Sequence, residues 1–125
     1  MAPVDVRPEI ARVLSLAETL ANLGDDPELL RELLDFFVEV APQQLDDLAA
    51  VIAAGDVAAT EMLAHGMKGG AANVGAVRMA ATARELELLT KDGSLEGAEA
   101  LMTDLRAEFA ALAAVLPGVD WQRLG

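Results

Sequence analysis

Five short helix-breaking stretches divide this sequence into segments whose lengths suit the helices of a small bundle. They are GDDP at 24–27, GD at 55–56, Gly75, DGS at 92–94 and PG at 117–118. Asp26 before Pro27 is typical of a helix start, because aspartate caps free amides and proline fits the first helical position. Gly55 suits the left-handed residue that ends a helix, and Asp56 suits the cap of the next one. We expect Ser94 to cap the last long helix.

Between these stretches, apolar residues recur at intervals of three and four, as they do along one face of a helix. The periodicity predicts helices over 27–54, 57–73, 76–91 and 95–116, with a shorter leading helix over about 8–22. Pro42 lies inside the first long segment, and we expect it to kink that helix rather than end it, because the apolar stripe continues beyond it. The predicted core positions include Ile10, Leu14, Leu20, Leu30, Leu34, Phe37, Ala41, Leu48, Ile52, Leu63, Met67, Val74, Met79, Ala83, Leu86, Thr90, Ala98, Leu101, Leu105, Phe109, Leu112 and Leu116.

Short loops place sequential helices side by side and antiparallel. The predicted fold is therefore all-α: an antiparallel up-down-up-down four-helix bundle with a short leading N-terminal helix. The length of 125 residues suits one domain over 1–125, with the bundle core at about 27–116. Hydrophobic residues make up 54% of the chain and aromatic residues only 3%, so the core is expected to be aliphatic.

Composition also excludes several classes of function. The formal net charge of −12 disfavours binding to nucleic acid or to an anionic membrane surface, since both need a basic face. The chain has no cysteine, which rules out disulfides and thiolate metal sites. With no signal peptide or membrane-spanning run in the sequence, we expect a cytoplasmic protein.

The stretch AHGMKGGAANVG at 64–75 holds the only histidine of the chain and four glycines. At about 100° per residue, His65 falls on the side of its helix opposite Leu63 and Met67, so it is expected to face solvent. Its neighbours at helical spacing are Glu61, Met62, Lys68 and Gly69, and the same face continues through Ala72. The Met62 and Met67 pair is interpreted as core filling rather than cofactor binding.

An exposed imidazole beside one ammonium, on a surface of very small residues, suits the delivery or removal of an anion. Phosphoryl transfer needs such an approach, because its catalysis is mostly positioning and charge stabilisation. Gly66 and Gly70 have an alternative interpretation as helix-packing residues. On the next helix, Arg84 and Glu87 share a flank with Ala80 and Lys91. If that flank borders His65, Glu87 can accept a hydrogen bond from Nδ1–H and leave Nε2 as the nucleophile.

These residues resemble a known signature. AHGMKGGAANVGAVRMAATARELE at 64–87 is similar to the motif of histidine phosphotransfer (HPt) domains, and the resemblance extends over about 27–116. His65, Lys68, Gly69 and Gly75 all match. The resemblance implies a bundle that relays phosphoryl groups between the aspartates of response-regulator receiver domains. In that scheme His65 carries the phosphoryl group on Nε2, Lys68 helps to neutralise it, Gly69 lets the receiver dock, and Glu87 hydrogen-bonds the imidazole.

The resemblance also implies partners and cofactors. The partners would be response-regulator receiver domains and a hybrid or sensor histidine kinase. The protein itself would be a monomer that carries a phosphoryl group without turnover of its own. No cofactor is expected on this chain, and Mg²⁺ would sit on the receiver. A metal site is not expected, because there is one histidine, no cysteine and no HExxH motif. Candidate docking residues are Gly69, Met62, Glu61, Ala72 and Arg84. Leu14 is a further docking candidate, although an interpretation as a buried core residue fits the sequence equally well.

Two departures from the family pattern leave alternatives open. Gly70 and Ala71 stand where many members have serine or alanine, so no hydroxyl is available there. Glu87, where many members have glutamine, resembles the phospho-acceptor modules of chemotaxis-type kinases. The chain is therefore alternatively such a module of a histidine kinase, although the opening Met1 and the clean end of the last helix favour a free-standing protein. A non-catalytic helical adaptor that binds receivers is the third hypothesis.

Overall fold

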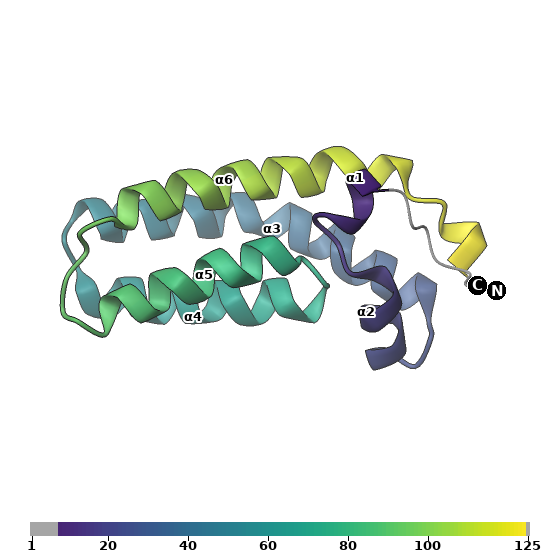
Figure 1. Cartoon of the computed structure of the whole chain (residues 1–125), viewed down its shortest axis with the longest axis horizontal. Helices are drawn as coiled ribbons and strands as arrows, with labels where there is room; N and C mark the ends of the chain where they lie inside the picture. The colour runs from purple at the N-terminus through teal and green to yellow at the C-terminus, as the bar shows by residue number, and fades with distance from the viewer. Residues whose placement is uncertain (1–7, 125) are drawn as a thin grey trace.

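Four long antiparallel helices build the protein, whose computed structural model describes residues 8–124. They are α3 (Pro27–Ala53), α4 (Val57–Asn73), α5 (Val77–Thr90) and α6 (Ala98–Val115). Two short helices, α1 (Pro8–Ala11) and α2 (Leu16–Asn22), precede the bundle, and the 3₁₀ turns η1 (Leu116–Gly118) and η2 (Trp121–Leu124) follow it. Figure 1 shows α5 and α6 in front of α4 and α3. The prediction of an all-α up-down-up-down bundle is confirmed.

The helix ends follow from local chemistry. The carboxylate of Asp26 accepts a hydrogen bond from the amide of Leu29 at 3.1 Å, and that of Asp56 accepts one from Ala59 at 3.0 Å. Both predicted caps are confirmed. The predicted Ser94 cap is wrong: α6 begins at Ala98 after Gly97, whose φ is +88°. The Ser94 hydroxyl instead accepts from the amide of Glu96 at 3.0 Å, which forms a turn ahead of the helix.

The single leading helix predicted over about 8–22 is also wrong, because the chain breaks into α1 and α2. The amide of Ser15 does not continue a helix but donates to the carbonyl of Gly75 at 2.8 Å, in the turn between α4 and α5. Gly75 has φ +77°, and a Cβ there would lie 2.9 Å from the Ser15 carbonyl oxygen. Only glycine allows this approach. A contact between segments far apart in the sequence therefore separates α2 from α1.

The core follows the predicted apolar stripes. The residues predicted for α3 are buried, and so are Met79, Ala83, Leu86 and Thr90 of α5. Ile10, Leu14 and Leu20 of the leading segment are buried too. Leu14 is 1% exposed, so its candidacy as a docking residue is wrong and the alternative core position is correct. Leu101 and Phe109 of α6, Leu116 of η1 and Leu63 of α4 are only partly buried against this core.

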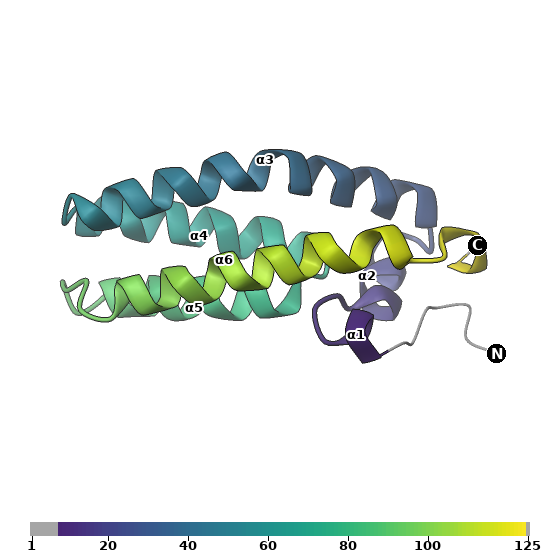
Figure 2. The ribbon, with the colours of Figure 1, turned by 90° about the horizontal axis from the view of Figure 1, so that it is seen from above.

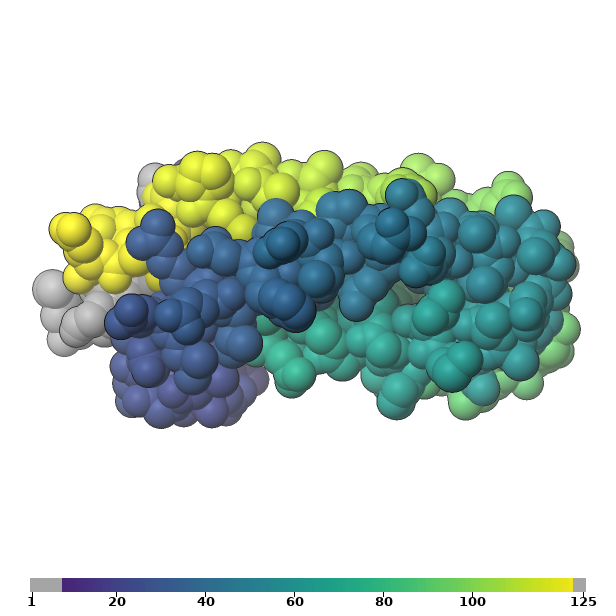
Figure 3. Space-filling model, turned by 180° about the vertical axis from the view of Figure 1, so that it is seen from behind, coloured from purple at the N-terminus to yellow at the C-terminus, as the bar shows by residue number. Residues whose placement is uncertain are grey.

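Helix α3 continues past Pro42, as predicted, and it is bowed along its length (Figure 2), whereas a kink at Pro42 itself stays a prediction. From behind, α3 crosses the molecule between α6 and α4, with α2 against one end (Figure 3). The contact between α4 and α5 is the most extensive between any two helices of residues 8–124. No helix in this described range is long and apolar enough to cross a membrane.

Candidate functional site

His65 lies at the middle of α4 and is the residue around which the site is built. Its side chain is 67% exposed, in agreement with the helical-wheel expectation. The surface beside it is flat, because a Cβ added at Gly66 or Gly69 would meet no atom within 4 Å. A Cβ at Gly70 would touch the Phe37 ring at an ordinary 3.7 Å. The packing interpretation is therefore wrong for Gly66, whereas Gly70 does lie at the contact with Phe37 of α3, where a Cβ would still fit.

Glu87 reaches this surface from α5 and joins two residues of α4. Its Oε2 lies 2.6 Å from Nδ1 of His65, and its Oε1 accepts a hydrogen bond from Nζ of Lys68 at 2.7 Å. The Glu87 side chain is only 13% exposed, whereas His65 remains open to solvent. The sequence left this contact conditional on how α5 is rotated, and the structure brings the three residues together.

The electrostatics of the cluster decides which atom of His65 is free to react. The hydrogen bond from Lys68 lowers the pKa of Glu87, and the hydrogen bond with His65 lowers it further, against the opposing effect of burial. Glu87 is thus ionised at neutral pH and can only accept hydrogen bonds. A neutral imidazole that meets it must donate from Nδ1, which leaves the lone pair on Nε2. In this tautomer Nε2 carries no proton and is the ring nitrogen open to a partner.

A second contact between α4 and α5 lies one helical turn away. Nζ of Lys91 is 2.7 Å from Oε2 of Glu61, and the Thr90 hydroxyl lies 3.5 Å from the same oxygen. The Thr90 hydroxyl also donates to the carbonyl of Glu87 at 2.6 Å. Sequence reasoning missed the roles of Thr90 and Lys91 and the bond between Lys68 and Glu87. The available signal was the spacing of opposite charges on two adjacent antiparallel helices.

The other predicted docking residues surround this cluster without joining it. Met62 is 68% exposed, so its interpretation as core filling is wrong, although Met67 is buried as expected. Ala72 and Arg84 are exposed on α4 and α5. The exposed apolar side chain of Leu88, which sequence reasoning did not single out, follows Glu87 on α5. The site is therefore a small polar cluster within an open surface of small and apolar residues.

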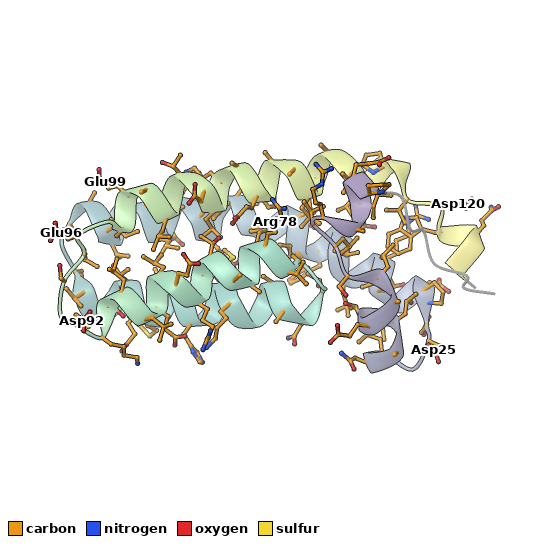
Figure 4. All side chains as sticks on the ribbon, viewed as in Figure 1. Asp25, Arg78, Asp92, Glu96, Glu99 and Asp120 are labelled. Atoms are coloured by element: carbon orange, nitrogen blue, oxygen red, sulfur yellow. The ribbon has the colours of Figure 1, made fainter. Side chains whose placement is uncertain are left out.

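The charges of the chain are distributed unevenly around this surface. Both lysines of the sequence, Lys68 and Lys91, bridge α5 to α4. Five of the acidic side chains lie at the ends of the bundle, with Asp92, Glu96 and Glu99 at one end and Asp25 and Asp120 at the other (Figure 4). Within residues 8–124, no group of three or more histidine, aspartate or glutamate side chains is arranged to hold a metal ion.

A four-helix bundle that presents one open histidine, with a carboxylate on Nδ1 and an ammonium beside it, defines a protein that can carry a phosphoryl group on an imidazole. The comparison with protein families agrees, because the sequence model of the Hpt domain matches residues 32–115. The chain belongs to the Hpt domain family. This membership gives it a phosphotransfer role in two-component signalling, with kinases and response regulators as its classes of partner. Hpt proteins are phosphocarriers and generally not classical enzymes.

Two solved structures are similar to this chain. Histidine-containing phosphotransfer protein B (HptB) from Pseudomonas aeruginosa PAO1 is 35% identical, with a TM-score of 0.78 over 90% of this chain and 97% of that one. A putative histidine-containing phosphotransfer protein from rice is 20% identical, with a TM-score of 0.66 over 97% of this chain and 78% of that one. The rice protein shows a likeness of fold alone. No curated protein matches the sequence.

Proposed function

We propose that this protein relays a phosphoryl group between the aspartates of response-regulator receiver domains, carrying it on Nε2 of His65. The observation that supports this most is the contact of Nδ1 of His65 with the Glu87 carboxylate at 2.6 Å, on a ring that is otherwise open to solvent. The contact sets the tautomer in advance, and the exposure leaves Nε2 accessible to a partner. The proposal names His65, Lys68 and Glu87 as the residues that perform the transfer.

In the accepting step, the Nε2 lone pair attacks the phosphorus of a receiver aspartyl phosphate. The new N–P bond forms as the P–O bond to the aspartate breaks, and the aspartate leaves as a carboxylate. The ring keeps its Nδ1 proton and gains positive charge, which the Glu87 carboxylate stabilises. The Lys68 ammonium can turn toward the phosphoryl oxygens and offset their charge. In the donating step, the carboxylate of the second receiver attacks the phosphorus and the neutral imidazole leaves.

Receiver docking is proposed to use the open surface around His65. Gly66 and Gly69 let the partner approach the imidazole, since nothing stands above them. Met62, Ala72 and Arg84 lie exposed around this approach, and Glu61 stands one turn before His65. We propose that any Mg²⁺ needed for transfer is held by the receiver, and that the protein acts as a cytoplasmic monomer.

Replacement of His65 tests the proposal directly. His65→Gln is expected to abolish labelling by a phosphorylated receiver, because no imidazole remains to accept the phosphoryl group. The side chain is 67% exposed, so circular dichroism should show unchanged helicity and a nearly unchanged melting temperature. Labelling of the His65→Gln protein would show that another residue is the acceptor.

The carboxylate at Glu87 favours a second candidate function, the phospho-acceptor module of a histidine kinase. The two candidates differ in their phosphoryl donor. Incubation with a panel of phosphorylated receivers, and in parallel with kinase domains and ATP, identifies which donor labels His65 faster. The adaptor hypothesis predicts a different result. The wild-type protein would bind receivers without ever being labelled, and the His65→Ala variant would still bind them.

A further inference from the structure

Glu87 lies in the last turn of α5, where a helix is least firmly held by its own hydrogen bonds. Helix α5 ends at Thr90, and the carbonyls of Leu88, Leu89 and Thr90 accept only from the amides of the turn that follows the helix, at 3.0–3.3 Å. Helix ends of this kind fray unless side chains or neighbouring elements hold them. The carboxylate that orients His65 therefore depends on support from outside α5.

Thr90 and Lys91 connect this last turn to its surroundings. The Thr90 hydroxyl donates to the carbonyl of Glu87 at 2.6 Å, which satisfies one of the free acceptors. Lys91 directly follows α5, and its ammonium lies 2.7 Å from the Glu61 carboxylate on α4. A positive charge at this position also interacts favourably with the carbonyl end of the helix. The end of α5 is thus bound to α4 through Glu61.

The Glu61–Lys91 contact repeats the register of the His65–Glu87 contact. Glu61 precedes His65 by four residues on α4, and Lys91 follows Glu87 by four residues on α5. Four residues are about one turn of an α-helix. Because α4 and α5 run antiparallel, the two contacts join matching heights on the two helices. A slide or rotation of the end of α5 would therefore break both contacts together.

We propose that Glu61 and Lys91 form a positioning pair, which holds the last turn of α5 in the register that brings the Glu87 carboxylate to Nδ1 of His65. The inference rests on the proposed function of His65 as the phosphoryl acceptor. Lys91 acts through Glu87 rather than on the imidazole itself. The electrostatics is consistent with this role, because the hydrogen bond to Glu61 raises the pKa of Lys91 and the nearby charge of Glu87 adds to the increase.

The experiment measures the imidazole tautomer and the transfer rate in the same variants of the full chain. Lys91→Met and Glu61→Gln remove one charge each and keep the shape of the side chain. In ¹⁵N NMR spectra of the isolated protein, both are expected to lower the fraction of neutral His65 that carries its proton on Nδ1. Phosphotransfer should slow by about two- to fivefold, the effect of one partly exposed ion pair.

Rescue and coupling distinguish a pair from two independent residues. Lys91→Arg keeps the charge and the reach of the side chain, and it is expected to retain the wild-type tautomer fraction and rate. The double variant Glu61→Gln with Lys91→Met should be no worse than either single variant, because all three lose the same contact. Additive losses would mean that each residue acts separately, for example by touching the partner, and would overturn the proposal.

Arg106→Met is the matched control. It breaks another partly exposed ion pair, between Arg106 and Asp46 at 3.0 Å, which joins α6 to α3. It should change neither the tautomer fraction nor the transfer rate. An unchanged tautomer fraction in Lys91→Met and Glu61→Gln would overturn the positioning role. Because the NMR measurement needs no phosphate, a tautomer shift in a protein that accepts no phosphoryl group would support the pair and contradict the proposed function of His65.

Discussion

Two glutamates, one on each side of α5, have side-chain pKa values that are shifted in opposite directions. Glu87 projects from α5 toward α4, and each of its carboxylate oxygens has a partner, His65 for one and Lys68 for the other. Glu108 projects from α6 toward α5, where one oxygen accepts from the Thr82 hydroxyl at 2.9 Å. Its other oxygen, Oε1, is buried without a hydrogen-bond partner in the described part of the chain. Partners lower the pKa of Glu87, whereas burial raises that of Glu108.

The difference shows that the partners of a carboxylate, rather than its residue type, decide what it can do. Glu87 stays ionised beside an imidazole and can stabilise positive charge on that ring. Burial raises the pKa of Glu108, and the negative charges of Asp104 and Glu85 add to the increase. The hydrogen bond from Thr82 and the positive charge of Arg78 offset only part of it. On the α4–α5 side both carboxylate oxygens have a partner beside an exposed histidine, whereas on the α5–α6 side one carboxylate oxygen is buried without a partner among the described residues. Four substitutions test this contrast.

Filling the open surface on the α4–α5 side is expected to have the largest effect. Gly69→Leu places a bulky side chain one turn from His65, and it should slow phosphotransfer on the order of 100-fold by holding the partner away from the imidazole. The fold should be retained, because the site faces solvent. Ala110→Leu, at an exposed position of α6, is the matched control and should transfer normally. Unimpaired transfer by Gly69→Leu would show that docking does not use this surface.

Removing the carboxylate from Glu87 comes next. Glu87→Ala leaves Nδ1 of His65 without its acceptor, and transfer should slow by about 10- to 100-fold, as for other histidines that lose their orienting partner. Glu87→Gln is the conservative comparison, since its amide oxygen can still accept from Nδ1 while the attraction to Lys68 is lost. Its rate should lie between those of the wild type and Glu87→Ala. Equal rates for all three proteins would contradict the orienting role.

Removing Lys68 is expected to make Glu87 more like an ordinary glutamate. In Lys68→Met, the pKa of Glu87 should rise toward its usual value of 4.5, as followed by ¹³C NMR of the carboxyl carbon. Because its native pKa is lowered, ionised Glu87 stabilises the fold at pH values above about 4.5. This contribution is lost as the pH falls through the native pKa of Glu87. Any stability difference from the wild type should therefore vanish in acid. Transfer should slow by about fivefold, and an unshifted Glu87 pKa would contradict the role of the Lys68 bond.

The smallest expected effect concerns Glu108 and changes stability rather than transfer. The raised native pKa favours the protonated form, so the contribution of Glu108 to stability is complete below about 4.5 and is lost as the pH rises through its native pKa. Glu108→Gln, which stays neutral, should be more stable than the wild type by about 1 kcal/mol at pH 7. The gain should disappear near pH 4, as measured by denaturant unfolding. Glu39→Gln, at an exposed position of α3, is the control. If Glu108→Gln were more stable than the wild type by the same amount at every pH, the gain would not come from the buried charge of Glu108.

The helices themselves were predictable because their signals are local. The bounds predicted for α4 agree with Val57–Asn73, since Asp56 caps its start and Gly75 follows its end. The exposure of His65 also followed from the position of Met67 on the same helix. Ser94 misled the prediction of the α6 start, because the same hydroxyl can cap a helix or, as it does here, stabilise a turn.

The contacts between helices could not be predicted with the same certainty. Whether Glu87 meets His65 depends on the rotation of α5 about its axis, and a sequence pattern gives a face no finer than a broad stripe. The break between α1 and α2 depends on a hydrogen bond from Ser15 to Gly75, which are sixty residues apart. The bond between Lys68 and Glu87 and the pair formed by Glu61 and Lys91 arise from the same register of α4 against α5.

The amino-acid sequence by itself determined the helical segments, their apolar faces and the solvent-facing position of the one histidine. These properties depend on residues a few positions apart, which the chain brings together through the geometry of a single helix. Only the tertiary structure decided which carboxylate meets that histidine, which lysine supports the carboxylate, and which glutamate has an oxygen that is buried without a partner among residues 8–124. Each of these depends on how one helix is rotated and shifted against another, and that is set by the packing of the whole core.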